Sequence, residues 1–254
     1  MQQELYIYLI VFLYGIIIGS FLNVLIYRIP KKEDVIIKSS SCTKCGHRLQ
    51  WYDLIPLFSY ICLKGRCRYC NEKISRQYPI IEALNAIVYV LIYTTFGIGI
   101  YTVIVCLFSS ILIAISIIDF RTYIIPDSLN VTIFLLALIS LIFTNDLMDN
   151  IIGFFIISGI MLILLIIFRH LRNVNVFGGG DIKLMAVAGL FLGAKLIVLA
   201  FFIGCILGSV IHSLRMKFSK EGSFLAFGPY LCAGIFISVL FGRGIIDWYI
   251  SLLM

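Results

Sequence analysis

Two aspartates stand where the sequence passes between polar and strongly apolar residues. Asp181 follows three consecutive glycines at 178–180 and precedes an apolar run, and Asp119 ends the apolar run 102–118. An acid at the edge of a membrane segment is a functional-site hypothesis by default. Two carboxylates that meet at a partly dehydrated site do not both ionise readily, so one keeps a proton. The protonated acid can polarise a carbonyl while the ionised one activates water, which is the chemistry of metal-free peptide hydrolysis.

Each acid near the membrane also has a structural interpretation. Asp is a favoured N-cap residue, so Asp181 could simply begin a helix. Asp127 follows a proline and precedes an apolar run, which is typical of a helix start. Glu82 lies about one turn into an apolar run and could pair with Arg76 or Lys73. If the two aspartates are catalytic, Asp127, Lys183 and Glu82 are candidates for supporting roles.

The glycines before Asp181 predict an interruption of helix, because glycine alone takes positive φ without strain and lets another backbone approach closely. We therefore interpret Gly178, Gly179 and Gly180 as a loop against which a substrate chain could lie.

Four cysteines predict a metal site. Cys42 and Cys45 form one C-x2-C pair, Cys67 and Cys70 form another, and 21 residues separate the pairs. Four thiolates suit tetrahedral Zn²⁺, and a site closed by four protein ligands is structural. Two disulfides are the alternative, but thiols stay reduced in the cytoplasm, where the charge pattern places this segment.

The composition indicates a membrane protein. Hydrophobic residues make up 61% of the 254 positions and charged residues 13%, the mean hydropathy is +1.07, and about a quarter of an average soluble domain is charged. The first apolar run, 5–27, has no basic segment before it and is too long for a signal peptide, so we expect an uncleaved span with the N-terminus outside. Further apolar runs occupy 80–96, 100–118, 128–143, 150–168, 184–212 and 224–241.

The charge pattern predicts eight spans. The run 184–212 is over-long for one helix, and two short spans turning near Gly193 place 18 of the 20 Lys and Arg residues on one side. Cytoplasmic loops carry such an excess, so the segments 28–79, 119–127, 169–183 and 213–223 are expected inside. The net charge of +7 is then mostly a topology signal and an attraction to anionic lipid, not a nucleic-acid footprint.

We therefore expect an all-α polytopic membrane protein with about eight transmembrane helices and a small cytoplasmic insert resembling a zinc ribbon. The first helix covers residues 1–27, the four-cysteine zinc-binding domain 28–79, and a transmembrane peptidase domain 80–254. Both aspartates lie at the cytoplasmic edge of the bilayer in this topology.

Several motifs occur together in one order along the chain. They are Gly178-Gly179-Gly180-Asp181, which fits G-x-G-D, and the segments 20–30 (SFLNVLIYRIP), 53–59 (DLIPLFS), 65–70 (GRCRYC), 74–79 (ISRQYP), 119–127 (DFRTYIIPD) and 227–230 (FGPY). In this combination the chain resembles the type IV prepilin leader peptidases, which are G-x-G-D aspartic proteases of the membrane. The resemblance covers residues 16–236. Ala226 departs from it, since the family often has proline there.

The resemblance implies a bifunctional enzyme of the bacterial cytoplasmic membrane. Such an enzyme cleaves the short basic leader of type IV prepilins or pseudopilins after a glycine, on the cytoplasmic side, and then N-methylates the new N-terminus with S-adenosylmethionine. By motif position, Asp119 and Asp181 become the catalytic pair and the four cysteines the metal ligands. Because the sequence contains no glycine-rich nucleotide loop on a strand, no residue is assigned to the methyl donor.

Two alternatives stay open at this point. The protein could be a peptidase without methyltransferase activity, in which the zinc domain docks the substrate. It could also be a non-enzymatic membrane assembly factor or transporter, with the acids serving as a proton relay.

Overall fold

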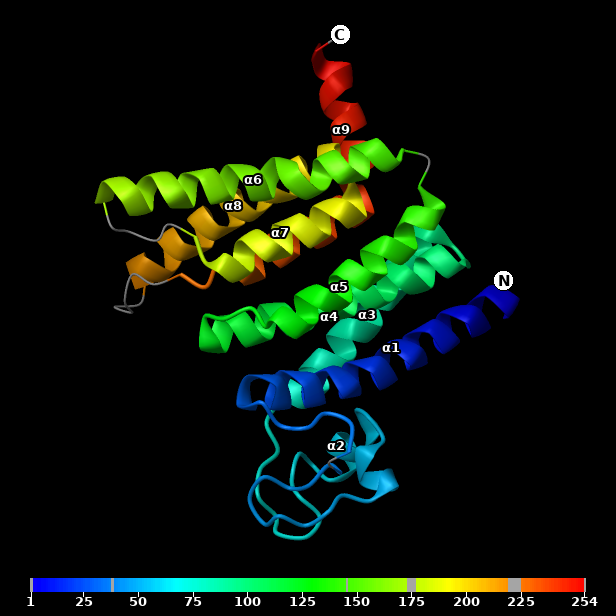
Figure 1. Ribbon diagram of the computed structural model, residues 1–254. Coiled ribbons are helices and arrows are strands. Elements are labelled where there is room, and N and C mark those ends of the chain that lie inside the picture. The colour runs from blue at the N-terminus through cyan, green and yellow to red at the C-terminus, as the bar shows by residue number, and fades with distance from the viewer. Residues whose placement is uncertain (1, 38, 145, 173–176, 219–224, 254) are drawn as a thin grey trace. The chain divides into compact units, whose positions relative to one another are not determined.

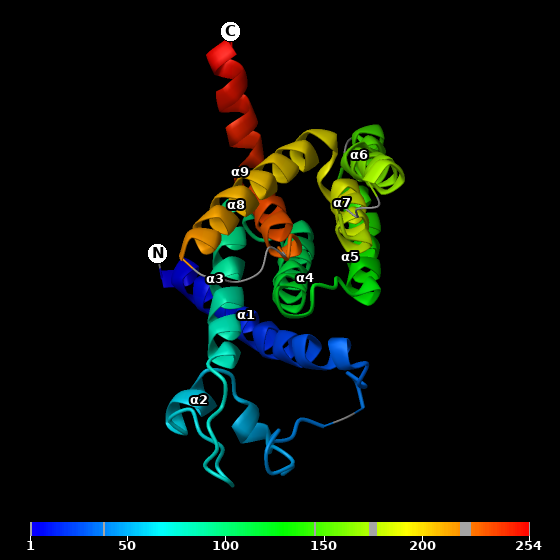
Figure 2. The ribbon, with the colours of Figure 1, turned by 90° about the vertical axis from the view of Figure 1, so that its left-hand side faces the viewer.

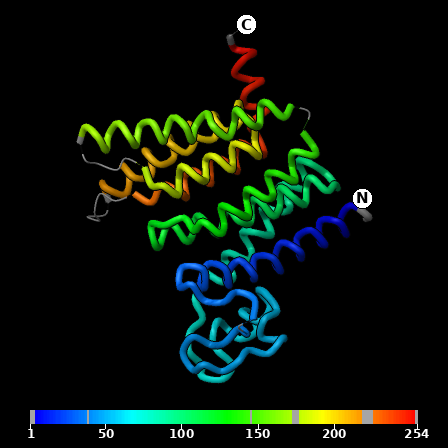
Figure 3. Tube along the Cα trace, in the orientation of Figure 1, coloured from blue at the N-terminus to red at the C-terminus, as the bar shows by residue number. Residues whose placement is uncertain are grey.

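Helices form the regular secondary structure of the part of the chain that the computed structural model describes, which is residues 2–37, 39–144, 146–172, 177–218 and 225–253. Within these residues the strand-like pairing is limited to two isolated β-bridges. The α-helices are α1 (Gln2–Arg28), α2 (Phe58–Cys62), α3 (Gln77–Phe96), α4 (Ile100–Thr122), α5 (Asp127–Ser140), α6 (Leu147–Arg172), α7 (Gly179–Leu192), α8 (Ala194–Phe218) and α9 (Gly228–Leu253), and they can be followed in Figure 1 and along the trace in Figure 3.

Six of these helices are long and apolar enough to cross a membrane: α1, α3, α4, α6, α8 and α9. The other two expected spans are shorter. Helix α7 has 14 residues, and α5, also of 14, continues directly into a 3-10 helix at Leu141–Phe143. At 1.5 Å per residue α7 rises about 21 Å and the run Asp127–Phe143 about 26 Å, both less than the roughly 30 Å of a hydrocarbon core. The expected all-helical membrane architecture is confirmed, and the two short helices are the ones that begin near Asp127 and Asp181.

The predicted break in the run 184–212 is present, because α7 ends at Leu192 and α8 begins at Ala194. Gly193 between them has φ 84°, in the left-handed region that favours glycine.

Two helices extend beyond the apolar runs that the sequence indicated. Helix α9 continues past 241 to Leu253, and α8 past 212 to Phe218. Residues 242–253 are mostly apolar, with Arg243, Asp247 and Ser251 as the polar exceptions, and contain no proline that would end the helix.

The chain divides into two compact units, residues 1–110 and 111–254, and α4 begins in the first and ends in the second. In the first unit, α1 and α3 pack closely and antiparallel. The Asn85 side chain on α3 donates to the Gly15 carbonyl oxygen on α1 over 2.8 Å. A Cβ on Gly15 would lie 2.5 Å from Ala86 Cα, so the close approach of the two helices requires glycine at this position.

In the second unit α7 packs against α5, α6, α8 and α9, and Figure 2 shows it between α5 and α6. Nine of its 14 residues are buried. Gly189 on α7 and Gly153 on α6 face each other, and a Cβ on either would collide with the other's backbone. Close packing through small residues is the usual way in which membrane helices associate. The first turn of α7, which carries Asp181, is therefore held on a well-packed element.

Candidate active site and cysteine cluster

Asp119 and Asp181 both lie in the second unit and are both buried. Asp119 stands near the end of α4 with 5% of its surface exposed, and Asp181 stands in the first turn of α7 with 9% exposed. The two carboxylates are close enough for the charge of Asp119 to act on Asp181. The fold therefore brings together two acids that are 62 positions apart in the sequence.

Each carboxylate accepts a hydrogen bond from a backbone amide at a helix start. The Gly228 N–H, in the first residue of α9, donates to Asp119 Oδ2 over 3.0 Å. The Gly178 N–H, at the N-cap of α7, donates to Asp181 Oδ2 over 3.2 Å. Helix N-termini present free N–H groups and a positive end of the peptide dipoles, both of which favour a negative charge.

Both of these amides belong to glycines, and the structure explains why. A Cβ on Gly228 would lie 2.7 Å from Asp119 Oδ2, and one on Gly178 would lie 3.0 Å from Asp181 Oδ2. A side chain at position 228 would displace the Asp119 carboxylate, and one at position 178 would require the Asp181 carboxylate to shift by a few tenths of an ångström. Neither glycine takes a positive φ, so close approach and not backbone conformation is what requires them.

The structure reveals a second link that sequence reasoning missed. Phe177 and Phe227 each precede one of these two glycines, and their ring centroids lie 6.3 Å apart with the planes tilted by 37°. The separation is within the range of attractive aromatic pairs. The signal in the sequence was the repeated Phe-Gly at 177–178 and 227–228, although nothing in the sequence indicated that the two copies meet.

The glycines at 178–180 do not form the expected open loop. Gly178 is the N-cap of α7, with φ −71°, and Gly179 and Gly180 are the first two residues of that helix. A Cβ on Gly180 would lie 2.8 Å from Ile125 Cβ, whereas one on Gly179 would have no atom within 4 Å. Gly180 is therefore explained by packing, and Gly179 is the glycine with open space in front of it.

Asp181 does not occupy the N-cap either. It is the third residue of α7 and reaches back to the N-cap amide, which is the acidic half of a capping box. The Asp181 side chain thus both caps α7 and belongs to the candidate site that contains Asp119.

Asp127 and Lys183 form an ion pair, with 2.7 Å between Lys183 Nζ and Asp127 Oδ1. Asp127 is the first residue of α5, and Pro126 takes the N-cap position that the sequence favoured for the acid. The Lys183 side chain is 59% exposed and the Asp127 side chain 69%. The pair joins the starts of α5 and α7 at the surface.

Glu82 belongs to the first unit and has a different partner from those expected. Its Oε2 accepts the backbone N–H of Leu57 over 2.8 Å, where the sequence favoured Arg76 or Lys73. Only 6% of Glu82 is exposed. Its contact fixes the segment before α2 to the second turn of α3.

The four predicted cysteines form one cluster. The sulfur atoms of Cys42, Cys45, Cys67 and Cys70 all lie within 4.8 Å of one another, and those of Cys42 and Cys70 are 3.8 Å apart. Tetrahedral coordination with bonds of about 2.3 Å places sulfurs about 3.8 Å from each other. All four are free thiols. The cluster therefore fits a tetrahedral metal ion, and the disulfide alternative is wrong for this structure.

Both cysteine pairs are built on the same backbone turn. The Cys42 N–H donates to the His47 carbonyl and the Gly46 N–H to the Cys42 carbonyl, and Cys67 makes the matching bonds with Glu72 and Asn71. Gly46 has φ 71° and Asn71 has φ 56°. Asparagine tolerates this left-handed conformation better than most residues. Gly46 and Asn71 therefore occupy equivalent left-handed positions in the two turns.

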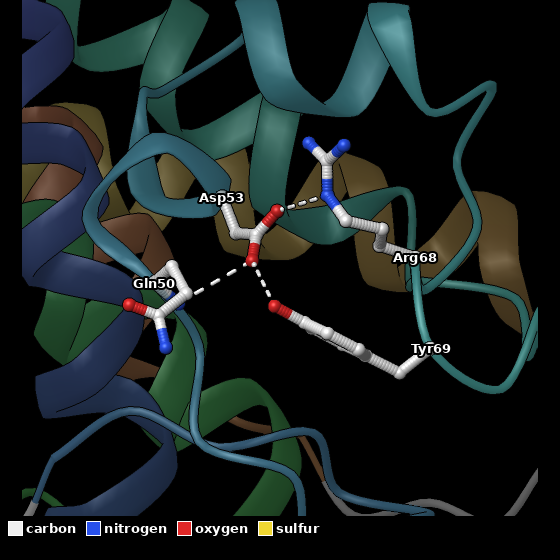
Figure 4. Close-up of polar contacts among 4 residues, drawn as sticks. All are labelled: Gln50, Asp53, Arg68 and Tyr69. Atoms are coloured by element: carbon white, nitrogen blue, oxygen red, sulfur yellow. Dashed lines mark hydrogen bonds and ion pairs between the residues drawn. The ribbon is translucent and has the colours of Figure 1, made fainter.

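A buried carboxylate holds the second pair in place (Figure 4). Asp53, with a side chain 3% exposed, accepts hydrogen bonds from Arg68 Nε at 2.8 Å and from the Tyr69 hydroxyl at 3.3 Å. Both donors lie between Cys67 and Cys70. Burial alone raises the pKa of Asp53, but the hydrogen bonds from Arg68 and from the Gln50 amide outweigh it and hold that pKa below the usual aspartate value.

The sequence matches known families over most of its length. Residues 13–96 match the Bacterial Peptidase A24 N-terminal domain, and residues 106–213 match the Type IV leader peptidase family. A prepilin leader peptidase/N-methyltransferase of Vibrio cholerae is 35% identical over 226 residues, covering 85% of this chain and 88% of the relative. The chain belongs to the type IV leader peptidase family.

Other members of the family span nearly the whole chain. A prepilin leader peptidase/N-methyltransferase of Bacillus subtilis is 31% identical, and the alignment covers 96% of this chain and 98% of the relative. A prepilin leader peptidase/N-methyltransferase of Aeromonas salmonicida is 28% identical, and the alignment covers 96% of this chain and 94% of the relative. No solved structure is a significant match. The cysteine cluster falls within the segment that matches the N-terminal domain, and both buried aspartates fall within the peptidase segment.

Proposed function

We propose that this protein is a prepilin leader peptidase in which Asp119 and Asp181 form the catalytic pair. The observation that supports the proposal is that both carboxylates are buried in one unit and that each accepts a backbone amide at a helix start, the two helix starts being joined by the contact between Phe177 and Phe227. The names of the relatives supply the class of substrate, and the two acids supply chemistry that suits peptide hydrolysis.

The proposed reaction needs the pair to share one proton. The ionised carboxylate removes a proton from water as the water oxygen attacks the scissile carbonyl carbon, and the protonated carboxyl donates its proton to the carbonyl oxygen. The tetrahedral intermediate then collapses: the second carboxylate takes back a proton from one hydroxyl group, the C–N bond breaks, and the leaving amine takes the proton that the first carboxylate had accepted, so the pair again shares one proton. The two acids titrate as a unit, so the roles belong to the pair.

The backbone amides have a defined part in this scheme. Each holds the Oδ2 atom of its aspartate, which fixes the orientation of the carboxylate. A neutral amide at a helix start favours ionisation of the aspartate but does not carry a full positive charge. The two aspartates can therefore still retain one proton between them.

We place the reaction at the cytoplasmic face. The support is the charge pattern, since the loops that flank Asp119 and Asp181 belong to the segments rich in Lys and Arg. A short basic leader that precedes an apolar helix would stay on that side for the same reason. The substrates are then type IV prepilins or pseudopilins, cut after the glycine that ends the leader.

The cysteine cluster is proposed to hold one Zn²⁺ in a structural role. Four sulfurs within 4.8 Å of one another leave no position for water or substrate on a four-coordinate ion. Zinc would cross-link the two turns of a segment whose described residues contain one short α-helix, α2, of five residues.

We further propose that the protein methylates the new N-terminus, with S-adenosylmethionine as donor of the methyl group. The support is the name shared by relatives that align over nearly the full chain.

The peptidase proposal is tested with purified protein in lipid and a purified prepilin. Asp119→Asn and Asp181→Asn should each lower the cleavage rate at least about 1,000-fold, because an asparagine side chain cannot take up and release the proton that the reaction transfers. Asp146→Asn, an exposed acid in the loop before α6, should cleave like the unchanged protein. Retained cleavage in either dyad variant would refute the assignment.

A further inference from the structure

One segment outside the membrane-spanning helices exposes large apolar side chains. Residues 51–61, which comprise the 3-10 helix Trp51–Leu54 and most of α2, are called the 51–61 patch below. The exposed apolar side chains are Trp51 (75%), Leu54 (43%), Ile55 (41%), Phe58 (61%) and Ile61 (69%). Exposed apolar residues on the spans face lipid, but this patch belongs to the cysteine-bearing segment and needs its own explanation.

A hydrogen bond fixes the depth of the patch relative to the membrane. The Leu57 N–H in the middle of the patch donates to Glu82 Oε2 over 2.8 Å. Glu82 lies five residues after Gln77, the first residue of its span, which is about 7 Å along the helix at 1.5 Å per residue. Helix α1 packs directly beside Glu82, since a Cβ on Gly19 would lie 2.7 Å from Glu82 Cα. The patch is thus tied to the second turn of the span formed by α3.

This depth is where amphipathic segments lie in a bilayer. Interfacial helices bury their apolar face about 5–10 Å into the boundary between headgroups and acyl chains. Tryptophan and tyrosine concentrate in the same layer, and Trp51 and Tyr52 begin the patch. Lys64 and Arg66 follow directly and are exposed, which places positive charge where anionic headgroups would meet it.

We infer that the 51–61 patch lies in the lipid surface and anchors the cysteine-bearing segment to an anionic bilayer, in addition to its two covalent connections to α1 and α3. The occupant of the apolar face is lipid, because the Glu82 contact ties the patch to a membrane span and because the exposed Lys64 and Arg66 beside it are complementary to anionic headgroups. This inference does not depend on the peptidase function.

The chain contains two tryptophans, which makes a direct test available. Trp248→Phe leaves Trp51 as the only indole. The full-length variant is reconstituted in vesicles of phosphatidylglycerol and phosphatidylethanolamine, with and without bromine on the acyl chains. Brominated lipid should remove about half or more of the Trp51 emission, and aqueous iodide should remove much less, as expected for an indole in the interface.

A matched pair of variants tests the rest of the patch in the same background. Phe58→Ser with Ile61→Ser should increase iodide quenching of Trp51 about two-fold, because an apolar face that no longer enters lipid lets the segment lift. Ile36→Ser is the control, since Ile36 is an isoleucine of the same segment that is 92% exposed but lies outside the patch. Circular dichroism of each variant checks that the helices are retained.

Three outcomes would overturn the inference. Trp51 could be quenched by iodide and not by brominated lipid, or iodide quenching could be unchanged in the Phe58 and Ile61 double variant. Trp51 could also be open to water in lipid alone and become protected only when a prepilin is added. This last result would make the patch a protein-docking surface instead.

Discussion

Phe177 and Phe227 pack against each other at the candidate site, with 6.3 Å between their ring centroids. Each ring precedes the glycine whose amide holds one of the two buried aspartates. The contact therefore joins the start of α7 to the start of α9, and with them the two amides that orient Asp181 and Asp119. We regard the two rings as positioning residues, since they act through the carboxylates.

Removing either ring should reduce kcat and leave KM nearly unchanged. Phe177→Ala and Phe227→Ala should each lower kcat about tenfold, because an aromatic pair contributes about 0.5–1.5 kcal/mol and a displaced carboxylate loses its alignment. The double variant should be little worse than either single one, since both changes break one contact. Phe202→Ala, on the exposed face of α8, is the control, and fully additive losses would contradict a shared role.

Substitutions of Gly180 and Gly179, the first residues of α7, distinguish a role in helix packing from a role in substrate binding. Gly180→Ala should lower activity and thermal stability together, because its Cβ would lie 2.8 Å from Ile125 Cβ, and Ile125→Gly should partly restore both. Gly179→Ala has open space and should be neutral or stabilising by up to about 1 kcal/mol, as alanine favours helix. Loss of cleavage by a stable Gly179→Ala protein would instead show that substrate approaches there.

The ion pair between Asp127 and Lys183 should be structural and weak. Both side chains are more than half exposed, and exposed pairs typically contribute about 0.2–1 kcal/mol. Asp127→Asn, Lys183→Met and the double variant form a cycle whose coupling energy in thermal unfolding should fall in that range. Cleavage rates should fall less than about fivefold in each, because about 1 kcal/mol corresponds to that factor. A loss as large as that of Asp119→Asn would place Asp127 in the chemistry.

Asp53 should control how tightly the cysteine cluster keeps its metal. Asp53→Asn removes the charge that binds Arg68 and Tyr69, so zinc should pass to a chelator about tenfold faster or more, as for other residues that orient metal ligands. Cys67→Ser should lose the metal outright, and Cys62→Ser, outside the cluster, should keep about one zinc per chain. Equal zinc retention in the Asp53→Asn and unchanged proteins would contradict this role.

Much of the architecture could be read from the sequence because membrane folding follows simple rules. The lengths of the apolar runs predicted the spans, and the unequal distribution of Lys and Arg between the two sides of the membrane predicted the break at Gly193. The cysteine cluster followed from spacing, since four thiols in two short turns have few other arrangements. These predictions depend on local sequence and on the side of the membrane, and neither requires knowledge of which helices touch.

What could not be predicted depends on contacts between distant residues. Gly180 was read as an open approach to substrate, but Ile125 occupies its open side. Glu82 was expected to pair with a nearby cation, yet its partner is a backbone amide 25 positions earlier. The Phe177–Phe227 contact and the Gly228 amide on Asp119 likewise need the tertiary fold, since each joins segments that no periodicity relates.

The most direct measurement is the mass of a prepilin N-terminus after co-expression with this protein. The account predicts loss of the leader after its terminal glycine and addition of one methyl group to the new first residue. Both changes should be absent with Asp119→Asn or Asp181→Asn, although these variants still insert in the membrane. A prepilin that keeps its full leader beside the unchanged protein, or that is still cut by either variant, would contradict the central claim.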